Sequence, residues 1–257
     1  MRADRANERV YRTRALVLKR RDQGEADRVV TVYTPGMGKL TLLARGVRKP
    51  ASRKAGHLEP FTHVDLLVAR SRSWDLITQA ETVYGFRGLR EDLDRAAYGY
   101  YLVELIDAFT QEDDSHPEVF DLALTGLRHL EGSGPLGLTA RWFDLALLRL
   151  SGYQPQLFAC VQCGETLAPV TNYFSAARGG MLCPRHGEGQ PGTEALDVGA
   201  LKVLRFLQAQ PYESVAQLEL TPGRMRQIEK LLADYIRLII ERRLQSPEFI
   251  REVREAG

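Results

Sequence analysis

The stretch RVVTVYTPGMGKLTLLA, residues 28–44, contains two short runs of β-favouring residues around a turn. The runs Arg28–Thr34 and Lys39–Ala44 are rich in valine, leucine and threonine, which fit the pleated surface of a sheet. Pro35 and Gly36 stop the first run, and the glycine-rich turn that follows joins the runs into a hairpin. This hairpin predicts that the N-terminal part of the chain is a β structure.

Three more β-rich runs surround the hairpin, at Val10–Leu18, His63–Ala69 and Trp74–Tyr84. Alternation in the first run is imperfect, because Arg12 and Arg14 share parity with Leu16 and Leu18. We expect this strand to bend or to contain a bulge. Five short strands of this kind predict a small five-stranded barrel, which is commonly an OB-fold.

From Glu91 onwards the apolar period changes from two to 3.6, which is typical of helices. The first helix should bury Tyr98, Tyr101, Leu102, Leu105, Ile106 and Phe109, and further helices are expected through Val119–Leu130, Ala140–Leu150, Val198–Leu207 and Pro222–Arg243. The predicted fold class is therefore α+β, with an N-terminal OB-fold barrel and a helical bundle interrupted by a small module. The predicted domains are residues 1–84 (barrel), 85–155 (first part of the bundle), 156–192 (interrupting module) and 193–257 (C-terminal part of the bundle).

The interrupting module carries Cys160-Val161-Gln162-Cys163 and Cys183-Pro184-Arg185-His186, which use all three cysteines of the chain. Two residues between ligands let one tight turn direct both side chains at a single tetrahedral ion. Gly164 follows the first pair, where such a turn often needs a positive φ. Buried or disulfide-bonded cysteines are the alternative, but three cysteines cannot all pair. Four protein ligands predict one structural Zn²⁺ with no open coordination position.

The charge of the chain is strongly polarised although its net value is only +2. Residues 1–72 contain 17 basic and 7 acidic residues, a net charge of +10, whereas residues 73–150 contain 6 and 14, a net charge of −8. Residues 151–257 are balanced, with 12 of each. The basic segment predicts a surface that binds a polyanion. A solvated basic surface without a partner is the alternative.

The polar loop after the hairpin concentrates this basic charge. We expect phosphate contacts from this loop and the strand before it, at Lys39, Arg45, Arg48, Lys49, Arg53 and Lys54, with Arg20, Arg21 and Arg28 as second choices. Such contacts hold the nucleic-acid backbone and carry little sequence information. Tyr11, Tyr33, Phe61 and Trp74 could stack on bases, but we expect each of them to belong to the barrel core.

The motifs resemble those of the RecO family of bacterial recombination mediators. The resemblance rests on Gly24–Val30, Gly38–Leu40, Ala44–Lys49, Leu58–Phe61 and the segment from Cys160 to Cys183, in the same order and over most of the chain. It implies a non-enzymatic protein of DNA repair and recombination that binds single- and double-stranded DNA and anneals complementary strands. It further implies that the protein acts with RecR and helps RecA load onto strands coated by single-strand-binding protein. His186 departs from the family pattern, where a fourth cysteine is common, but Zn²⁺ accepts three cysteines and one histidine.

Catalytic functions find little support in the chain. It has no G-x-x-x-x-G-K-[ST] phosphate loop, so we expect no nucleotide cofactor. Glu112-Asp113-Asp114 would suit a metal-dependent nuclease, but a solvated acidic turn between two helices is the preferred interpretation. We predict no catalytic residue. An RNA- or ribosome-associated adaptor with an OB-fold and a zinc ribbon is the alternative function.

The expected location is the bacterial cytoplasm, in association with the nucleoid. The segment Met1–Arg9 is polar and has no apolar signal-peptide core. No run of apolar residues is long enough to span a membrane, and a thiolate metal site suits a reducing compartment.

Overall fold

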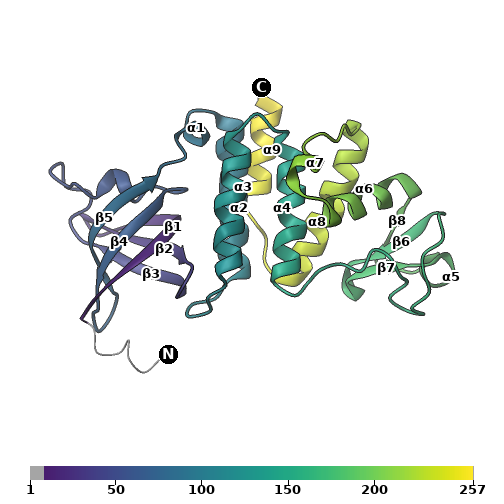
Figure 1. The fold of residues 1–257 in the computed structure, drawn as a ribbon, viewed down its shortest axis with the longest axis horizontal. Helices are drawn as coiled ribbons and strands as arrows, with labels where there is room; N and C mark the ends of the chain where they lie inside the picture. The colour runs from purple at the N-terminus through teal and green to yellow at the C-terminus, as the bar shows by residue number, and fades with distance from the viewer. Residues whose placement is uncertain (1–8, 257) are drawn as a thin grey trace. The chain divides into compact units, whose positions relative to one another are not determined.

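A computed structural model describes residues 9–256, which divide into two compact units, 9–132 with 246–256 and 133–245 (Figure 1). Met1–Glu8 lie outside the described residues, and with them most of the polar N-terminal segment and the start of the predicted barrel domain. Within the described residues, no helix is both long and apolar enough to cross a membrane.

The first unit begins with a closed five-stranded barrel. Its strands are β1 (Val10–Gln23), β2 (Asp27–Thr34), β3 (Gly38–Ala44), β4 (His63–Ala69) and β5 (Leu76–Tyr84). They pair in the order β1-β2-β3-β5-β4, and β3 and β5 are parallel while the other pairs are antiparallel. This confirms the predicted five-stranded barrel. Trp74 lies in the turn before β5, so its placement in a strand was wrong.

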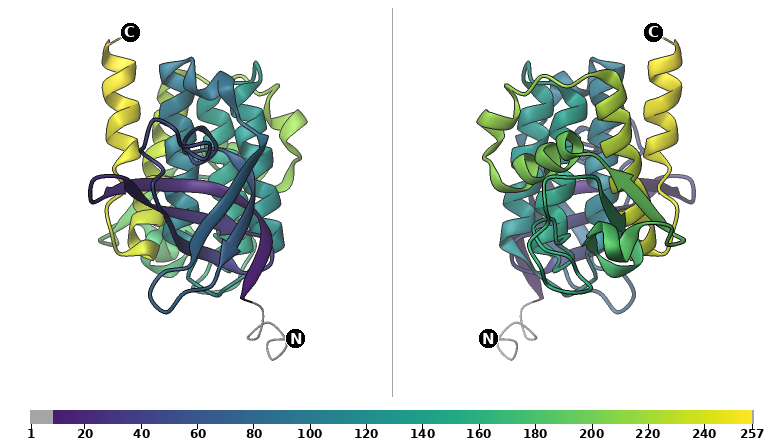
Figure 2. Two further views of the ribbon diagram at one scale, coloured as in Figure 1. Left: turned by 90° about the vertical axis from the view of Figure 1, so that its left-hand side faces the viewer. Right: turned by 90° about the vertical axis from the view of Figure 1, so that its right-hand side faces the viewer.

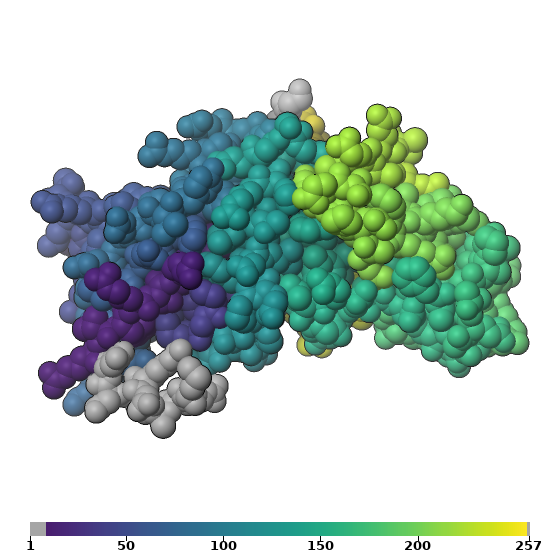
Figure 3. Space-filling model, in the orientation of Figure 1, coloured from purple at the N-terminus to yellow at the C-terminus, as the bar shows by residue number. Residues whose placement is uncertain are grey.

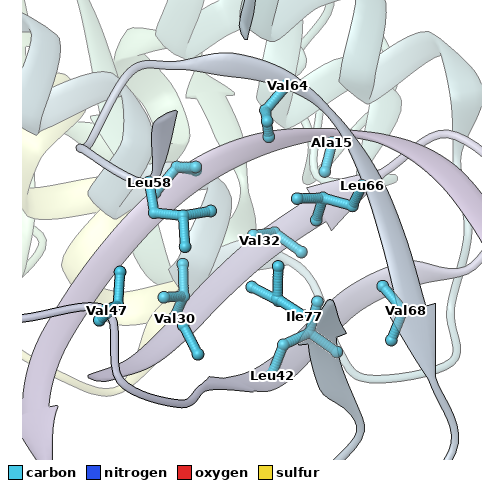
Figure 4. Close-up of a cluster of buried hydrophobic side chains, with 12 residues drawn as sticks. Ala15, Val30, Val32, Leu42, Val47, Leu58, Val64, Leu66, Val68 and Ile77 are labelled. Carbon is cyan, nitrogen blue, oxygen red and sulfur yellow. The ribbon is translucent and has the colours of Figure 1, made fainter. Parts of the chain in front are cut away.

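Valine and leucine side chains from all five strands fill the barrel. Figure 4 shows Val30, Val32, Leu66 and Ile77 directed toward one another. Val47 and Leu58 join this core from the connection between β3 and β4, which contains a short 3₁₀ turn at Ala55–His57. The polar loop is therefore anchored at both ends by apolar side chains.

Strand β1 is longer than predicted and contains the expected bulge. Val17 pairs with Val32 and Lys19 with Thr31, so Leu18 is an extra residue on β1. The bulge shifts Lys19 to the outer face of the barrel, whereas strict alternation would turn it inward with Val17. The strand crosses the barrel in Figure 2 (left).

Four helices complete the described part of the first unit. They are α1 (Arg87–Arg90), α2 (Leu93–Phe109), α3 (Pro117–Glu131) and α9 (Ser246–Ala256). Helix α2 packs on β1 and α3 on β2, while α1 and α9 pack on these two helices. Leu16 and Leu18 are buried although their parity is that of the exposed Arg12 and Arg14, because α2 packs against β1. Phe61 has a positive φ of 69° and packs against α2, with its ring 4.7 Å from that of Tyr100.

The second unit combines five helices with a small sheet. The helices are α4 (Leu136–Leu150), the short α5 (Pro184–Gly187), α6 (Val198–Ala209), α7 (Tyr212–Val215) and α8 (Pro222–Ile240). Thr221 caps α8, because its hydroxyl oxygen accepts a hydrogen bond from the Arg224 N–H. Helix α8 ends at Ile240, three residues before the predicted end, since Glu241 adopts the left-handed conformation.

The small sheet has three strands, β6 (Asn172–Ser175), β7 (Gly180–Leu182) and β8 (Thr193–Leu196), in the order β7-β6-β8. A 3₁₀ turn at Ala176–Arg178 joins β6 to β7, and α5 (Pro184–Gly187) follows β7. The sheet and α5 face the viewer in Figure 2 (right). Strand β8 lies C-terminal to residue 192 and still completes the sheet that supports the metal-ligand motifs.

Candidate metal centre and nucleic-acid interface

The two metal-ligand motifs meet in the second unit. Cys160, Cys163, Cys183 and His186 place one ligand atom each within 4.8 Å of one another. They are the only group of three or more His, Cys, Asp or Glu side chains within the described residues that is arranged to hold a metal ion. All four sequence-predicted ligands are therefore brought together.

The first pair is held by a tight turn. The Gly164 N–H donates to the Cys160 carbonyl at 2.8 Å, which folds the chain back after Cys163. Gly164 has φ +75°, as the motif predicted. A residue with a Cβ is strained at this φ, so glycine is what lets both sulfur atoms face one point.

The second pair lies on a single helical turn. Cys183 precedes α5, and the His186 N–H donates to the Cys183 carbonyl at 3.0 Å. The imidazole Nδ1 of His186 lies 3.3 Å from the Cys183 Sγ and 3.6 Å from the Cys160 Sγ. The i,i+3 spacing places both side chains on the same face of the turn.

The chemistry of this donor set fits a divalent cation. Burial raises the pKa of the Cys160 thiol, but N–H groups of Cys183, Cys163 and Gln162 donate to it and lower the pKa to about 6. The Glu165 N–H lowers the pKa of Cys163, but burial and the neighbouring thiols Cys160 and Cys183 raise it overall. Several thiols converging on one point repel each other when ionised, and a bound cation relieves that repulsion.

The segment 156–196, which holds the four candidate ligands and the three-stranded sheet and is called the ribbon below, is held together by backbone hydrogen bonds. The Gln156 N–H donates to the Gly179 carbonyl at 3.0 Å, and the Met181 N–H donates to the Gln156 carbonyl at 2.8 Å. The ring of Phe174 on β6 lies edge-on to Tyr235 of α8, 5.5 Å between centroids. The ligand turns therefore rest on a sheet that packs on a helix.

The predicted basic loop projects from the barrel between β3 and β4 (Figures 1 and 3). Arg45, Lys49 and Arg53 are exposed, and no carboxylate within the described residues lies at ion-pair distance from them. Arg48 is also exposed, but it donates to the Gly24 carbonyl at 3.1 Å and pairs with Asp22 at 3.4 Å. The loop thus presents a dense group of accessible cations.

Two of the lysines predicted to contact phosphate bind other groups of the protein. The Lys54 ammonium donates to the Ile77 carbonyl at 2.9 Å, and burial lowers its pKa. Lys39 donates to the backbone carbonyl of Asp107 at 2.8 Å, and its side chain is 17% exposed. Lys54 therefore fastens the loop to β5, and Lys39 fastens β3 to α2.

The second-choice residues lie at one end of the barrel. Arg20 and Arg28 share Glu59, at 2.9 and 3.1 Å, so both take part in ion pairs. Arg21 is exposed and its guanidinium lies 5.8 Å from the centre of the Trp74 ring. Trp74 is half-buried in its turn and does not belong to the barrel core that was expected for it.

Carboxylates cover one outer face of the barrel, the face formed by β2 and β3. Asp107 of α2 binds Lys39 and Lys19, the latter at 2.6 Å, and Thr41 donates to Glu112 at 3.0 Å. Tyr33 is fully buried on this face, where its hydroxyl donates to the His116 carbonyl at 3.3 Å. The side chains of the acidic turn Glu112–Asp114 are exposed, as predicted, and the turn also contacts β3 through Glu112.

Two exposed arginines were missed by the sequence-based choice. Arg12 and Arg14 lie on the outer face of β1, and together with Arg53 they line a groove of about 820 Å³. The broken alternation of Val10–Leu18 was the signal that could have found them, because arginine at an outward strand position is accessible unless a helix covers it.

Comparison with known proteins matches nearly the whole chain. The family model described as Recombination protein O N terminal matches residues 9–86, and the one described as Recombination protein O C terminal matches residues 90–248. The DNA repair protein RecO of Roseiflexus sp. is 41% identical over 248 residues, covering 96% of this chain and 87% of that protein. The proteins of the same name from Dehalococcoides mccartyi (strain 195) and Symbiobacterium thermophilum are 33% and 35% identical, covering 90% and 96% of this chain and 91% and 99% of their own lengths. On these matches, the chain belongs to the RecO family.

Proposed function

We propose that this protein is a DNA-binding recombination mediator of DNA repair that uses the exposed cations of the barrel. The observation that carries the proposal is the loop where Arg45, Lys49 and Arg53 stand exposed without carboxylate partners. Exposed cations on an OB-type barrel suit a single strand, because they contact the phosphates of any sequence. The relatives that share most of this chain carry the name DNA repair protein RecO.

Strand annealing follows from the same surface. Two complementary strands repel each other through their phosphates, and cations that neutralise both strands lower that repulsion. No nucleotide is needed for this step, so the protein should act without ATP and without chemistry on DNA. Family membership supports the further proposal that it cooperates with RecR and helps RecA load onto strands coated by single-strand-binding protein.

We further propose that the metal is one Zn²⁺ with a structural role. Three cysteine sulfur atoms and one imidazole nitrogen are the donor set that Zn²⁺ favours, and four protein ligands leave no open position for a reaction. When bound, the ion holds the two ligand turns together. Cys160, Cys163, Cys183 and His186 would supply the ligands.

An annealing assay tests the proposed function. The triple variant Arg45→Gln, Lys49→Gln, Arg53→Gln should anneal labelled complementary oligonucleotides more slowly than the wild type, without ATP or Mg²⁺ in either case. The dependence of the logarithm of affinity on the logarithm of salt concentration should become shallower by about 0.7 for each lost contact to a single strand. A control that removes the same charge elsewhere is Arg87→Gln, Arg149→Gln, Arg226→Gln, at three exposed positions.

The outcomes separate the candidate functions. Equal annealing by the triple variant and the wild type would remove the loop from the mechanism. Binding of RNA or DNA without any annealing would favour the adaptor function. Degradation of the labelled strands that depends on Mg²⁺ would favour a nuclease.

A further inference from the structure

The OB-fold commonly binds oligonucleotides on the face formed by strands 2 and 3. In this barrel that face is largely covered, most completely along β2, where Val29, Thr31 and Tyr33 are buried. Glu112 forms isolated β-bridges with Gly38 and Lys39, and its carboxylate accepts the Thr41 hydroxyl hydrogen bond. A Cβ built on Gly38 would lie 2.2 Å from the Asp114 carbonyl oxygen, so the acidic turn touches the strand backbone itself. A nucleic-acid strand bound there would have to displace the packed turn, and the carboxylates of the turn would repel its phosphates.

The outer face of β1, β4 and β5 is open instead. The groove of about 820 Å³ crosses this face, with Arg12 and Arg14 along β1 on one rim and Arg53 of the loop also lining it. All three arginines are exposed, and none of them has an ion pair with another described residue. The groove therefore offers cations from both the strand and the loop, at sites free to accept phosphate oxygens.

Its floor has the opposite charge. Asp65 pairs in register with Arg14 on β1 and with Glu81 on β5, so two exposed carboxylates face each other across the strands. Like charges at directly opposed positions destabilise a sheet, and neither carboxylate forms an ion pair within the described residues. Carboxylates on the floor repel phosphates, whereas they accept hydrogen bonds from the exocyclic amino groups of cytosine and adenine.

We propose that this groove is the site for a segment of single-stranded DNA, with phosphates on Arg12, Arg14 and Arg53 and with bases turned toward Asp65 and Glu81. The inference rests on the proposed DNA binding and assigns to it a surface and a side of that surface for the phosphates and for the bases. In a duplex one hydrogen of each amino group is used in base pairing and the other lies within the major groove, whereas a single strand can turn its whole base edge toward the floor, so the groove favours single strands. Bases with an exocyclic amino group fit the floor better than thymine, which has none.

The rim is tested by Arg12→Gln, Arg14→Gln in the full chain, with fluorescence anisotropy of labelled oligo(dC) and oligo(dT) at slightly alkaline pH. Affinity for both strands should fall, and the salt dependence should become shallower by about 0.7 for each lost phosphate contact. The charge-matched control is Arg87→Gln, Arg149→Gln. Circular dichroism and the melting temperature verify that each variant is folded.

The floor is tested by Asp65→Asn, Glu81→Gln. The wild type should bind oligo(dC) more tightly than oligo(dT), and this variant should gain affinity for oligo(dT), so that the ratio of affinities falls toward one. An unchanged ratio, or equal binding of both strands by the wild type, would overturn the orientation of the bases toward the floor.

Failure of the groove and failure of the proposed function give different results. A wild-type protein that binds neither strand contradicts the proposed function. A wild-type protein that binds DNA, loses affinity in the triple loop variant, and keeps full affinity in Arg12→Gln, Arg14→Gln contradicts the groove alone.

Discussion

The ribbon and the barrel differ in how far their functional residues depend on the rest of the fold. In the ribbon, two local turns bring four ligand atoms within 4.8 Å. In the barrel, basic residues close together in sequence differ in accessibility. Lys49 is exposed, whereas the ammonium of Lys54, five residues later, donates to a backbone carbonyl. Ligand spacing is a local constraint, but the availability of a charge depends on what the fold places beside it.

The largest effect should come from removing a metal ligand. Cys163→Ser should abolish stoichiometric zinc and destabilise the ribbon by several kcal/mol, less than the ~10–16 kcal/mol of isolated zinc-finger peptides because the sheet remains packed on α8. Elemental analysis and the melting temperature check this. Glu165→Gln, at a largely exposed position beside the site, should retain one zinc.

The same variant sharpens the comparison between the regions. Cys163→Ser should keep most of the DNA affinity, since the exposed cations of the barrel do not depend on the metal. A folded Cys163→Ser protein without DNA binding would move the DNA site into the ribbon. A well-folded wild-type protein with less than one zinc per chain would contradict the proposed metal.

The second effect concerns Asp107, the carboxylate of α2 that pairs with Lys19 and Lys39 of the barrel. Burial raises the pKa of Asp107, but Lys19 and Lys39 lower it overall, so the ionised form stabilises the fold. Asp107→Asn should cost about 2 kcal/mol, below the ~3–5 kcal/mol of a fully buried pair, because the Lys19 side chain is 59% exposed. Chemical denaturation measures it, with the exposed Asp121→Asn as control.

This effect should depend on pH with a defined sign. Because the pKa of Asp107 is lower in the folded state, its contribution is complete above the unfolded value of about 3.9 and is lost as the pH falls through the folded value. The difference in unfolding free energy between wild type and Asp107→Asn should therefore shrink below about pH 4. A constant difference at all pH values would show that the ion pair is not its cause.

A smaller effect isolates the backbone of the ligand turn. A Cβ at Gly164 would meet nothing within 4 Å, so the only destabilising effect of Gly164→Ala is the backbone strain of an alanine at φ +75°. The expected loss is about 1–2 kcal/mol. Gly56→Ala has the same open surroundings without a positive φ, and it should cost less. Equal melting temperatures for the two variants would contradict the requirement for glycine in the tight turn after Cys163.

The smallest effect lies at a barrel histidine. Burial lowers the pKa of His63 on β4, Asp65 partly opposes this, and Arg14 and Arg128 add to it. The unfolded chain then binds a proton more readily, so wild-type stability should decline as the pH falls below about 6.5. His63→Leu should remove that part of the decline, whereas the exposed His116→Gln should keep it. Parallel pH profiles of wild type and His63→Leu would refute the assignment.

Much of the candidate site was predictable where chemistry and spacing act locally. The two pairs of candidate ligands at i,i+3 spacing and the glycine of the first ligand turn, Gly164, follow from the sequence. So does the barrel hairpin around Pro35-Gly36. Charge alone could not separate Arg45 from Lys39, since the ammonium of Lys39 meets Asp107, 68 residues away. Nor could periodicity reveal that Leu16, on the same face as Arg12 and Arg14, is buried by α2.

The sequence by itself determined the class of the fold, the strands of the barrel, the four candidate metal ligands and the basic character of the N-terminal segment. These depend on side-chain period, turn chemistry and short spacings. Only the tertiary structure decided which cations are accessible, which barrel face is largely covered, and that Leu18 bulges so that Lys19 reaches α2. The physical reason is that ion pairs and burial join residues distant in the chain, and their partners are set by how the helices pack on the barrel.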